Sequence, residues 1–132
     1  MEYHAALDHF MRGESGPVKE LFSRRSDVTL ANPFGRTAEG WNAVERAADS
    51  AATHYKDGRA IRFETLAKLA TTELAYLHEV EHLESKVGGR DEIGTLALRV
   101  TTVFRREEGV WKVVHRHADP ITATRTPESV LS

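Results

Sequence analysis

The second half of the chain carries long stretches of strand-type sequence, and these constrain the fold more than any other feature. Apolar and polar side chains alternate over residues 61–69, which is the period of a strand with one buried face. Residues 96–106 (LALRVTTVFRR) and 110–121 (VWKVVHRHADPI) are rich in β-branched side chains. The intervening Glu107-Glu108-Gly109 is a hairpin signal. We therefore expect an antiparallel sheet in this half.

The first half of the chain predicts helices instead. Apolar residues recur at helical spacing over residues 3–11, and a short second helix is indicated over residues 17–22. Residues 40–55 predict a longer, alanine-rich helix with one apolar stripe. A brief strand is expected at residues 27–30, where the turn sequence ANPFG (31–35) follows it.

Residues 73–87 (ELAYLHEVEHLESKV) fit two structures. Their apolar residues are spaced acceptably for a helix, and the local propensity favours one. Their neighbours favour a strand, because strand sequence lies on each side and Gly88-Gly89 signals a turn. The residues alone leave both alternatives open.

The choice matters because this segment contains HEVEH (residues 78–82), which fits the zinc-binding pattern H-E-x-x-H. On a helix the two histidines lie one turn apart and can bind one zinc ion, with the glutamate as general base. On a strand four residues span roughly 13 Å, which is too far for two bonds of about 2 Å to one ion. A zinc hydrolase is therefore an alternative only if the segment is helical.

Three stretches of the chain resemble the nuclear transport factor 2-like superfamily, which includes ketosteroid isomerases, SnoaL-like polyketide cyclases and the association domain of calmodulin-dependent kinase II. They are LFSRRSDVTLANPFG (21–35), EGWNAV (39–44) and FRREEGVWKVVHRHAD (104–119). The resemblance implies an α+β fold, with a cone-shaped curved antiparallel β-sheet wrapped around N-terminal helices and enclosing a pocket. It also implies that residues 73–87 form a strand.

The same resemblance makes steroid isomerisation unexpected. The general-base aspartate of ketosteroid isomerases precedes a proline, and the matching position here is Asn32, before Pro33. An amide cannot accept a proton near neutral pH. The positions of that family's oxyanion donors fall near Ala6 and at residues 101–103, where no matching donor stands. Asn32 is expected to orient a substrate carbonyl or to stabilise the turn.

On the strand alternative, Tyr76, His78 and His82 share one face and are expected to line the pocket, while Glu79 and Glu81 point away. His78 falls where the kinase association domain has a pocket arginine. Because an imidazole changes its charge near neutral pH, His78 is the leading acid–base candidate.

His115 and His117 form a second candidate group, about 6.6 Å apart on one face of a strand. His115 is the other acid–base candidate. With Asp119 the two histidines could hold iron or zinc, although we expect no metal. Two hairpin registers are open: a two-residue loop pairs Thr102 with His115, and a three-residue loop pairs Thr102 with Val114. These registers turn the histidines to opposite faces of the sheet.

The other expected pocket residues are polar or aromatic side chains that could line its walls. The full set is Asn32, Phe34, Trp41, Tyr55, Phe63, Tyr76, His82, Thr102 and His117.

The composition limits the partners. A net charge of −2, with acids and bases mixed along 132 residues, favours neither nucleic acid nor a membrane as partner. The chain has no cysteine, which excludes disulfides and thiolate chemistry.

We expect a cytoplasmic protein without a cofactor, with one domain over residues 1–123 and a polar tail over residues 124–132. A homodimer formed through the sheet is the expected assembly.

Two functions follow from this. The first is binding of a small apolar or aromatic molecule, with isomerisation, cyclisation or dehydration by proton transfer through His78 or His115. The second is a non-catalytic ligand-binding or dimeric assembly module.

Overall fold

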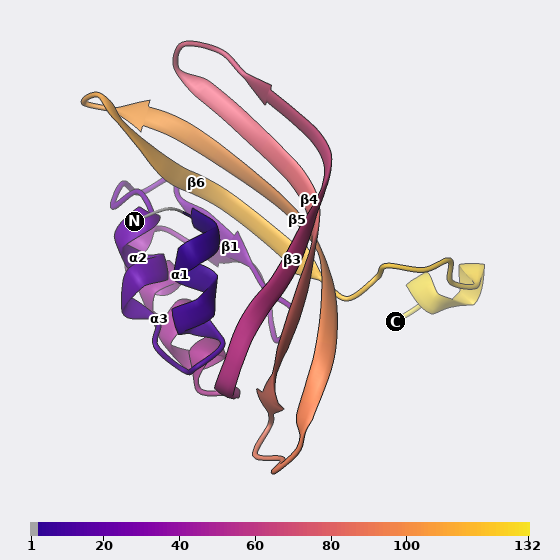
Figure 1. Ribbon diagram of the computed structural model, residues 1–132. Coiled ribbons are helices and arrows are strands. Elements are labelled where there is room, and N and C mark those ends of the chain that lie inside the picture. Colours follow the sequence, from indigo (N-terminus) through magenta and orange to yellow (C-terminus); the bar gives the residue numbers. More distant parts are fainter. Residues whose placement is uncertain (1–2) are drawn as a thin grey trace.

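The computed structural model describes residues 3–132, in which a curved six-stranded sheet has three helices on one side (Figure 1). Met1 and Glu2 of the expected domain lie outside the described residues. The strand order across the sheet is β2-β1-β6-β5-β4-β3. The elements in chain order are α1 (Tyr3–Phe10), α2 (Gly16–Leu21), β1 (Thr29–Ala31), β2 (Ala38–Glu39), α3 (Trp41–Ala52), β3 (Tyr55–Ala70), β4 (Leu74–Val87), β5 (Ile93–Glu107), β6 (Val110–Asp119) and the 3₁₀-helix η1 (Pro127–Val130). The expected α+β fold is confirmed.

The ambiguous segment is strand β4, which pairs antiparallel with β3 on one side and with β5 on the other. Two flanking strands satisfy its backbone groups along almost its whole length, so tertiary pairing overrides the local helix propensity. The sequence HEVEH is therefore extended, and the helical zinc-binding geometry does not form. Within residues 3–132 no group of three or more His, Asp or Glu side chains is placed to hold a metal ion.

The β5–β6 hairpin has a register that neither sequence alternative gives. Its loop is the two-residue turn Glu108-Gly109, with φ of 52° and 80°, as a tight hairpin turn requires. Pairing then shifts by one residue between Phe104↔Val113 and Val103↔His115, so Val114 is a bulge residue. Thr102 consequently lies opposite Arg116. The bulge turns Arg116 towards the helices and both neighbouring histidines towards the other face.

We call the face of the sheet that the helices cover the inner face, and the opposite face the outer face. Apolar side chains of all three helices are buried against the inner face, where they form the core with residues of the strands. The largest apolar side chains that are fully buried are Met11, Phe22, Val28, Val44, Leu83, Val100 and Val113.

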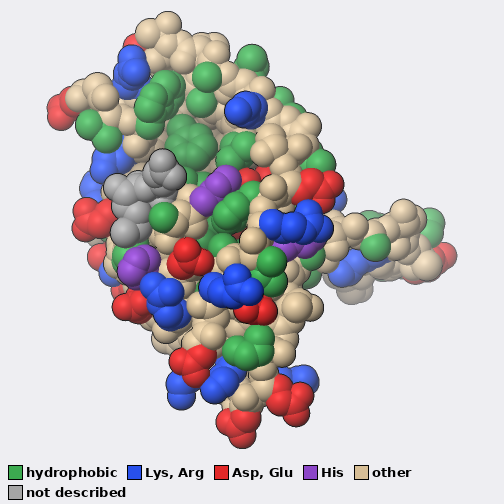
Figure 2. All heavy atoms as spheres, viewed as in Figure 1, with side chains coloured by type: hydrophobic (Ala, Val, Ile, Leu, Met, Phe, Trp, Pro, Cys, Tyr) green, Lys and Arg blue, Asp and Glu red, His purple; other side chains and the backbone are tan. Residues whose placement is uncertain are grey.

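Positive and negative side chains are intermixed on the face that Figure 2 shows. On the face in view, no extended basic stripe of the kind that binds nucleic-acid backbones is seen. None of the helices within residues 3–132 is long and apolar enough to cross a bilayer. After β6 the chain continues as an arm that projects away from the sheet and ends in η1 (Figure 1).

Candidate functional site

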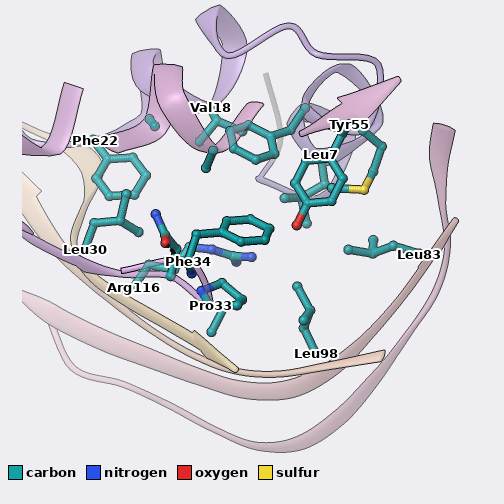
Figure 3. A pocket seen from close by; sticks show the side chains of 16 residues that line it. Leu7, Val18, Phe22, Leu30, Pro33, Phe34, Tyr55, Leu83, Leu98 and Arg116 are labelled. Carbon is teal, nitrogen blue, oxygen red and sulfur yellow. Dashed lines mark hydrogen bonds between the residues drawn. The ribbon is translucent and has the colours of Figure 1, made fainter. Parts of the chain in front are cut away.

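A cavity lies between the helices and the inner face of the sheet (Figure 3). The cavity volume that is open to water is about 40 Å³, which is space for a few water molecules. Its walls are mostly apolar side chains from α1, α2, α3, the β1–β2 loop and the inner strands, and its polar lining residues are few. The lining residues are Leu7, Phe10, Met11, Val18, Phe22, Leu30, Asn32, Pro33, Phe34, Ala48, Ala51, Tyr55, Leu83, Leu98, Arg116 and Ala118.

The β1–β2 loop places an aromatic ring in this cavity. The Oδ1 atom of Asn32 accepts a hydrogen bond of 2.9 Å from the backbone N–H of Phe34, which closes a turn around Pro33. Figure 3 shows the Phe34 ring among the lining side chains, on the Arg116 side of Tyr55. The Phe34 side chain is nevertheless 47% exposed, so it lies at the boundary between cavity and solvent.

Arg116 is the one charged side chain of the lining. Its guanidinium makes a two-point ion pair with Glu81, at 2.9 Å from Nη1 to Oε2 and 2.8 Å from Nη2 to Oε1. Nη1 also donates to the hydroxyl of Tyr3, which is 2.8 Å from Oγ1 of Thr102. Burial lowers the pKa of Arg116, but the charge of Glu81, together with Tyr3 and the hydrogen bonds to both residues, raises it overall. The arginine is therefore permanently charged and fixed in position.

A second buried carboxyl group lies two residues before Glu81 on the inner face. Glu79 contacts the imidazole of His4, whose Nε2 is 2.9 Å and 3.2 Å from its two oxygens. The His4 ring also stacks on Phe63, with 3.6 Å between ring centroids. Burial raises the pKa of Glu79, and Glu81 raises it further. Burial acts in the same direction on Glu81, but Arg116 lowers the pKa of Glu81 overall. Burial therefore favours the neutral form of Glu79, whereas Arg116 favours the ionised form of Glu81.

The cavity lining is poor in groups that could exchange protons. Among its residues only Arg116 and Tyr55 are titratable, and burial raises the pKa of Tyr55 to about 12. Neither side chain can accept a proton near neutral pH. The lining can hold an apolar molecule and donate hydrogen bonds to it.

Three of the residues expected in the pocket line this cavity, namely Asn32, Phe34 and Tyr55. Two others lie on the same side of the sheet without lining it. Phe63 stacks on His4, and Thr102 contacts Tyr3. Trp41, at the start of α3, packs instead against Arg24, whose guanidinium lies 3.7 Å from the centroid of the ring.

The remaining candidates lie on the outer face and not in the cavity. His78 and His117 line an open depression there, together with Arg99, Thr101 and Asp119. Nδ1 of His78 contacts Oγ1 of Thr101 at 2.9 Å, and Nε2 of His117 lies 3.3 Å from Asp119.

His115 also lies on the outer face, where its Nδ1 is 2.7 Å from Oγ1 of Thr29 and burial lowers its pKa. Tyr76 and His82 occupy the same face of β4 as His78, with cross-strand partners Val103 and Ala97.

The expected orientation of β4 is therefore wrong with respect to this cavity. Glu79 and Glu81, expected to point away, are fully buried under the helices, and the face with His78 is turned outwards. The alternation within the strand was predicted correctly, but alternation alone does not say which face is covered.

Sequence reasoning missed the charged residues that matter most, which are Glu79, Glu81, Arg116 and His4. Buried charged residues are rare, so glutamates inside a strand are expected to face solvent. The available signal was the pair of glutamates at i and i+2 in a strand that has a neighbour on each side.

Known proteins share this architecture. The family model described as the SnoaL-like domain matches residues 3–122. A nuclear transport factor 2 (NTF2-like) superfamily protein from Salmonella enterica is similar with a TM-score of 0.75 at 16% identity, covering 96% of this chain and 88% of that one. None of the curated proteins matches the chain.

Two further solved structures have names that point to chemistry. A proposed dehydratase of the NTF2-like family from Streptomyces avermitilis has a TM-score of 0.73 at 19% identity, covering 90% of this chain and 91% of that one. A ketosteroid isomerase-like protein from Erwinia carotovora atroseptica has a TM-score of 0.72 at 16% identity and covers 90% of each chain. Identities this low establish a shared fold and leave the activity open.

Proposed function

This chain belongs to the SnoaL-like domain family, and we propose that its cavity binds a small, mainly apolar molecule that presents one oxygen atom to Arg116. The observation that supports this most is a charged guanidinium in an otherwise apolar cavity. The lining of ligand sites typically combines apolar walls with a few polar groups that fix the orientation of the ligand.

Arg116 has hydrogen-bonding capacity left for such a molecule. A guanidinium has five N–H donors, and three of them are used by Glu81 and Tyr3. Its Nε donates to none of the described residues. An acceptor oxygen in the cavity would thus meet a donor that is already oriented and needs no rearrangement.

Binding requires that the Phe34 ring moves. Ligand sites for drug-sized molecules have volumes of about 300–1,000 Å³, and the present cavity is far smaller. Phe34 stands on an exposed loop and is itself half exposed, so rotating it outwards mainly breaks its ring contacts with His54 and Tyr55, at 4.6 Å and 5.9 Å between centroids. The space that the ring occupies would then belong to the ligand.

Binding is better supported than proton transfer. The relatives named for dehydration and steroid isomerisation suggest an isomerase-, cyclase- or dehydratase-type reaction as the alternative. Such a reaction needs an acid or base within reach of the ligand, and the histidines proposed for this role, His78 and His115, lie on the outer face.

The test compares acetophenone with ethylbenzene, two molecules of similar shape of which only the first has an acceptor oxygen. Each is titrated into ¹⁵N-labelled protein, and the amide shifts are followed by NMR. We expect shifts at the lining residues, with acetophenone bound about tenfold more tightly, as one hydrogen bond to a charged donor contributes. Shifts confined to the outer face, or none with either molecule, would contradict the proposal.

A further inference from the structure

We infer that the cavity selects an uncharged acceptor, such as a ketone, an aldehyde or an ester, over a carboxylate, and that Glu81 is the residue that sets this preference. The inference rests on the proposed binding function and concerns the chemical class of the ligand. It follows from counting the charges that are buried around Arg116.

The count covers the groups of α1, β4 and β6 that meet on the inner face, which we call the inner charged cluster: Tyr3, His4, Glu79, Glu81 and Arg116. Arg116 and Glu81 are both ionised and cancel each other. Burial raises the pKa of Glu79, which favours its neutral form. Tyr3 is neutral, because burial raises its pKa. The charge of Arg116 is therefore already neutralised by Glu81, its two-point partner.

A neutral acceptor leaves this balance unchanged. A ketone oxygen accepts a hydrogen bond from the free donors of Arg116 and adds no charge to a region in which Glu81 is 0% exposed. Its binding costs only the desolvation of the oxygen, which the new hydrogen bond offsets.

A carboxylate would bring a second negative charge next to Glu81. Two carboxylates that share one site cannot both stay ionised without a large cost, and a proton is normally taken up instead. Carboxylate binding should therefore be weaker and should take up about one proton per molecule bound.

Glu81 and Glu79 form a matched pair for testing this. Both are fully buried glutamates on the inner face of β4, but only Glu81 neutralises Arg116. Glu81→Gln keeps the shape and an acceptor for the guanidinium while leaving the charge of Arg116 without its partner. Glu79→Gln removes a buried carboxyl group from the same face of the strand and leaves the Arg116–Glu81 pair in place.

The experiment measures the affinity of acetophenone and benzoate for the wild-type chain and both variants at pH 8 by calorimetry. Repeating it in phosphate and in Tris, which differ in ionisation enthalpy, counts the protons taken up. We expect the wild type and Glu79→Gln to bind acetophenone at least tenfold more tightly than benzoate. In Glu81→Gln the order should reverse, and the proton uptake with benzoate should disappear.

The possible failures are distinguishable. If wild-type protein binds benzoate as tightly as acetophenone without proton uptake, the charge-selection inference is wrong and the binding function stands. The wild-type result decides this even if Glu81→Gln does not fold, which circular dichroism would reveal. If neither molecule binds the wild type, both the inference and the proposed function are wrong.

Discussion

Glu81 on β4 and Arg116 on β6 form a two-point ion pair across the inner face of the sheet, although β5 separates their strands. Neither side chain is more than 11% exposed. The pair is possible because the bulge at Val114 turns Arg116 inwards at the level of Thr102. A local irregularity of one hairpin thus determines which charge faces the cavity.

This pair should be costly to break and cheaper to replace. Removing one partner of a buried ion pair leaves an uncompensated charge and typically costs about 3–5 kcal/mol of unfolding free energy. We expect Arg116→Met alone to fall in this range, and the double variant Arg116→Met with Glu81→Leu to be more stable than Arg116→Met. Urea unfolding of the two single variants and the double variant completes the cycle. A double variant with the summed loss of both single variants would show that the charges do not interact.

Glu79 should make stability fall as the pH rises. Its pKa is raised above the ordinary value of 4.5 by burial, so the folded state holds the proton more tightly than the unfolded state does. Its contribution is fully present below pH 4.5 and is lost as the pH rises through the raised pKa. The Glu79→Gln variant lacks this group, so the stability difference between wild type and variant should change in that window. Urea midpoints from pH 4 to 8 measure it, and a difference that is constant with pH would contradict the prediction.

Phe34 should be nearly dispensable for folding while controlling access to the cavity. Because its side chain is 47% exposed, Phe34→Ala should cost less than about 1 kcal/mol. The same substitution at Phe22, which is 1% exposed, should cost about 3–5 kcal/mol. We also expect Phe34→Ala to bind acetophenone more tightly than the wild type. Unchanged or weaker binding in a folded Phe34→Ala protein would mean that the ring does not occupy the ligand's space.

The sequence was informative about elements and much less so about faces. Alternating side chains predicted β3, and β-branched residues predicted β5 and β6. Both signals lie within the sequence of the strand itself, because successive side chains of a strand point to opposite faces of the sheet. Whether residues 73–87 are a strand depended on neighbours, since local propensity favoured a helix.

The position of the charges could not be read from single strands. The outward orientation of His78 depends on where the helices pack. The outward orientation of His115 depends on the bulge at Val114, which no residue type in the sequence predicts. Glu79 and Glu81 are acceptable inside only because His4 and Arg116, far away in the sequence, supply their partners.

Gly58 should tolerate no side chain, because it lies in an irregularity of the β3–β4 pairing, between Lys56 and Arg59, where the backbone of β4 is very close. A Cβ atom added to Gly58 would lie 2.1 Å from the backbone oxygen of Glu84 and 2.8 Å from Cα of Ser85. The clash involves backbone atoms on a paired strand, so it can be relieved only by separating β3 from β4 and by disturbing the hydrogen bond of 3.0 Å from Gly58 N–H to the carbonyl of Met11.

We therefore expect Gly58→Ala to lower the unfolding free energy by about 3 kcal/mol, at the upper end of the range for overpacking. Gly94→Ala is the matched control, since its nearest atom, the oxygen of Ser85, is 3.9 Å away and the backbone there does not have positive φ. That variant should be neutral or stabilised by up to about 1 kcal/mol through the reduced entropy of the unfolded chain. Urea unfolding of both variants checks the prediction, which fails if the two substitutions have equal effects.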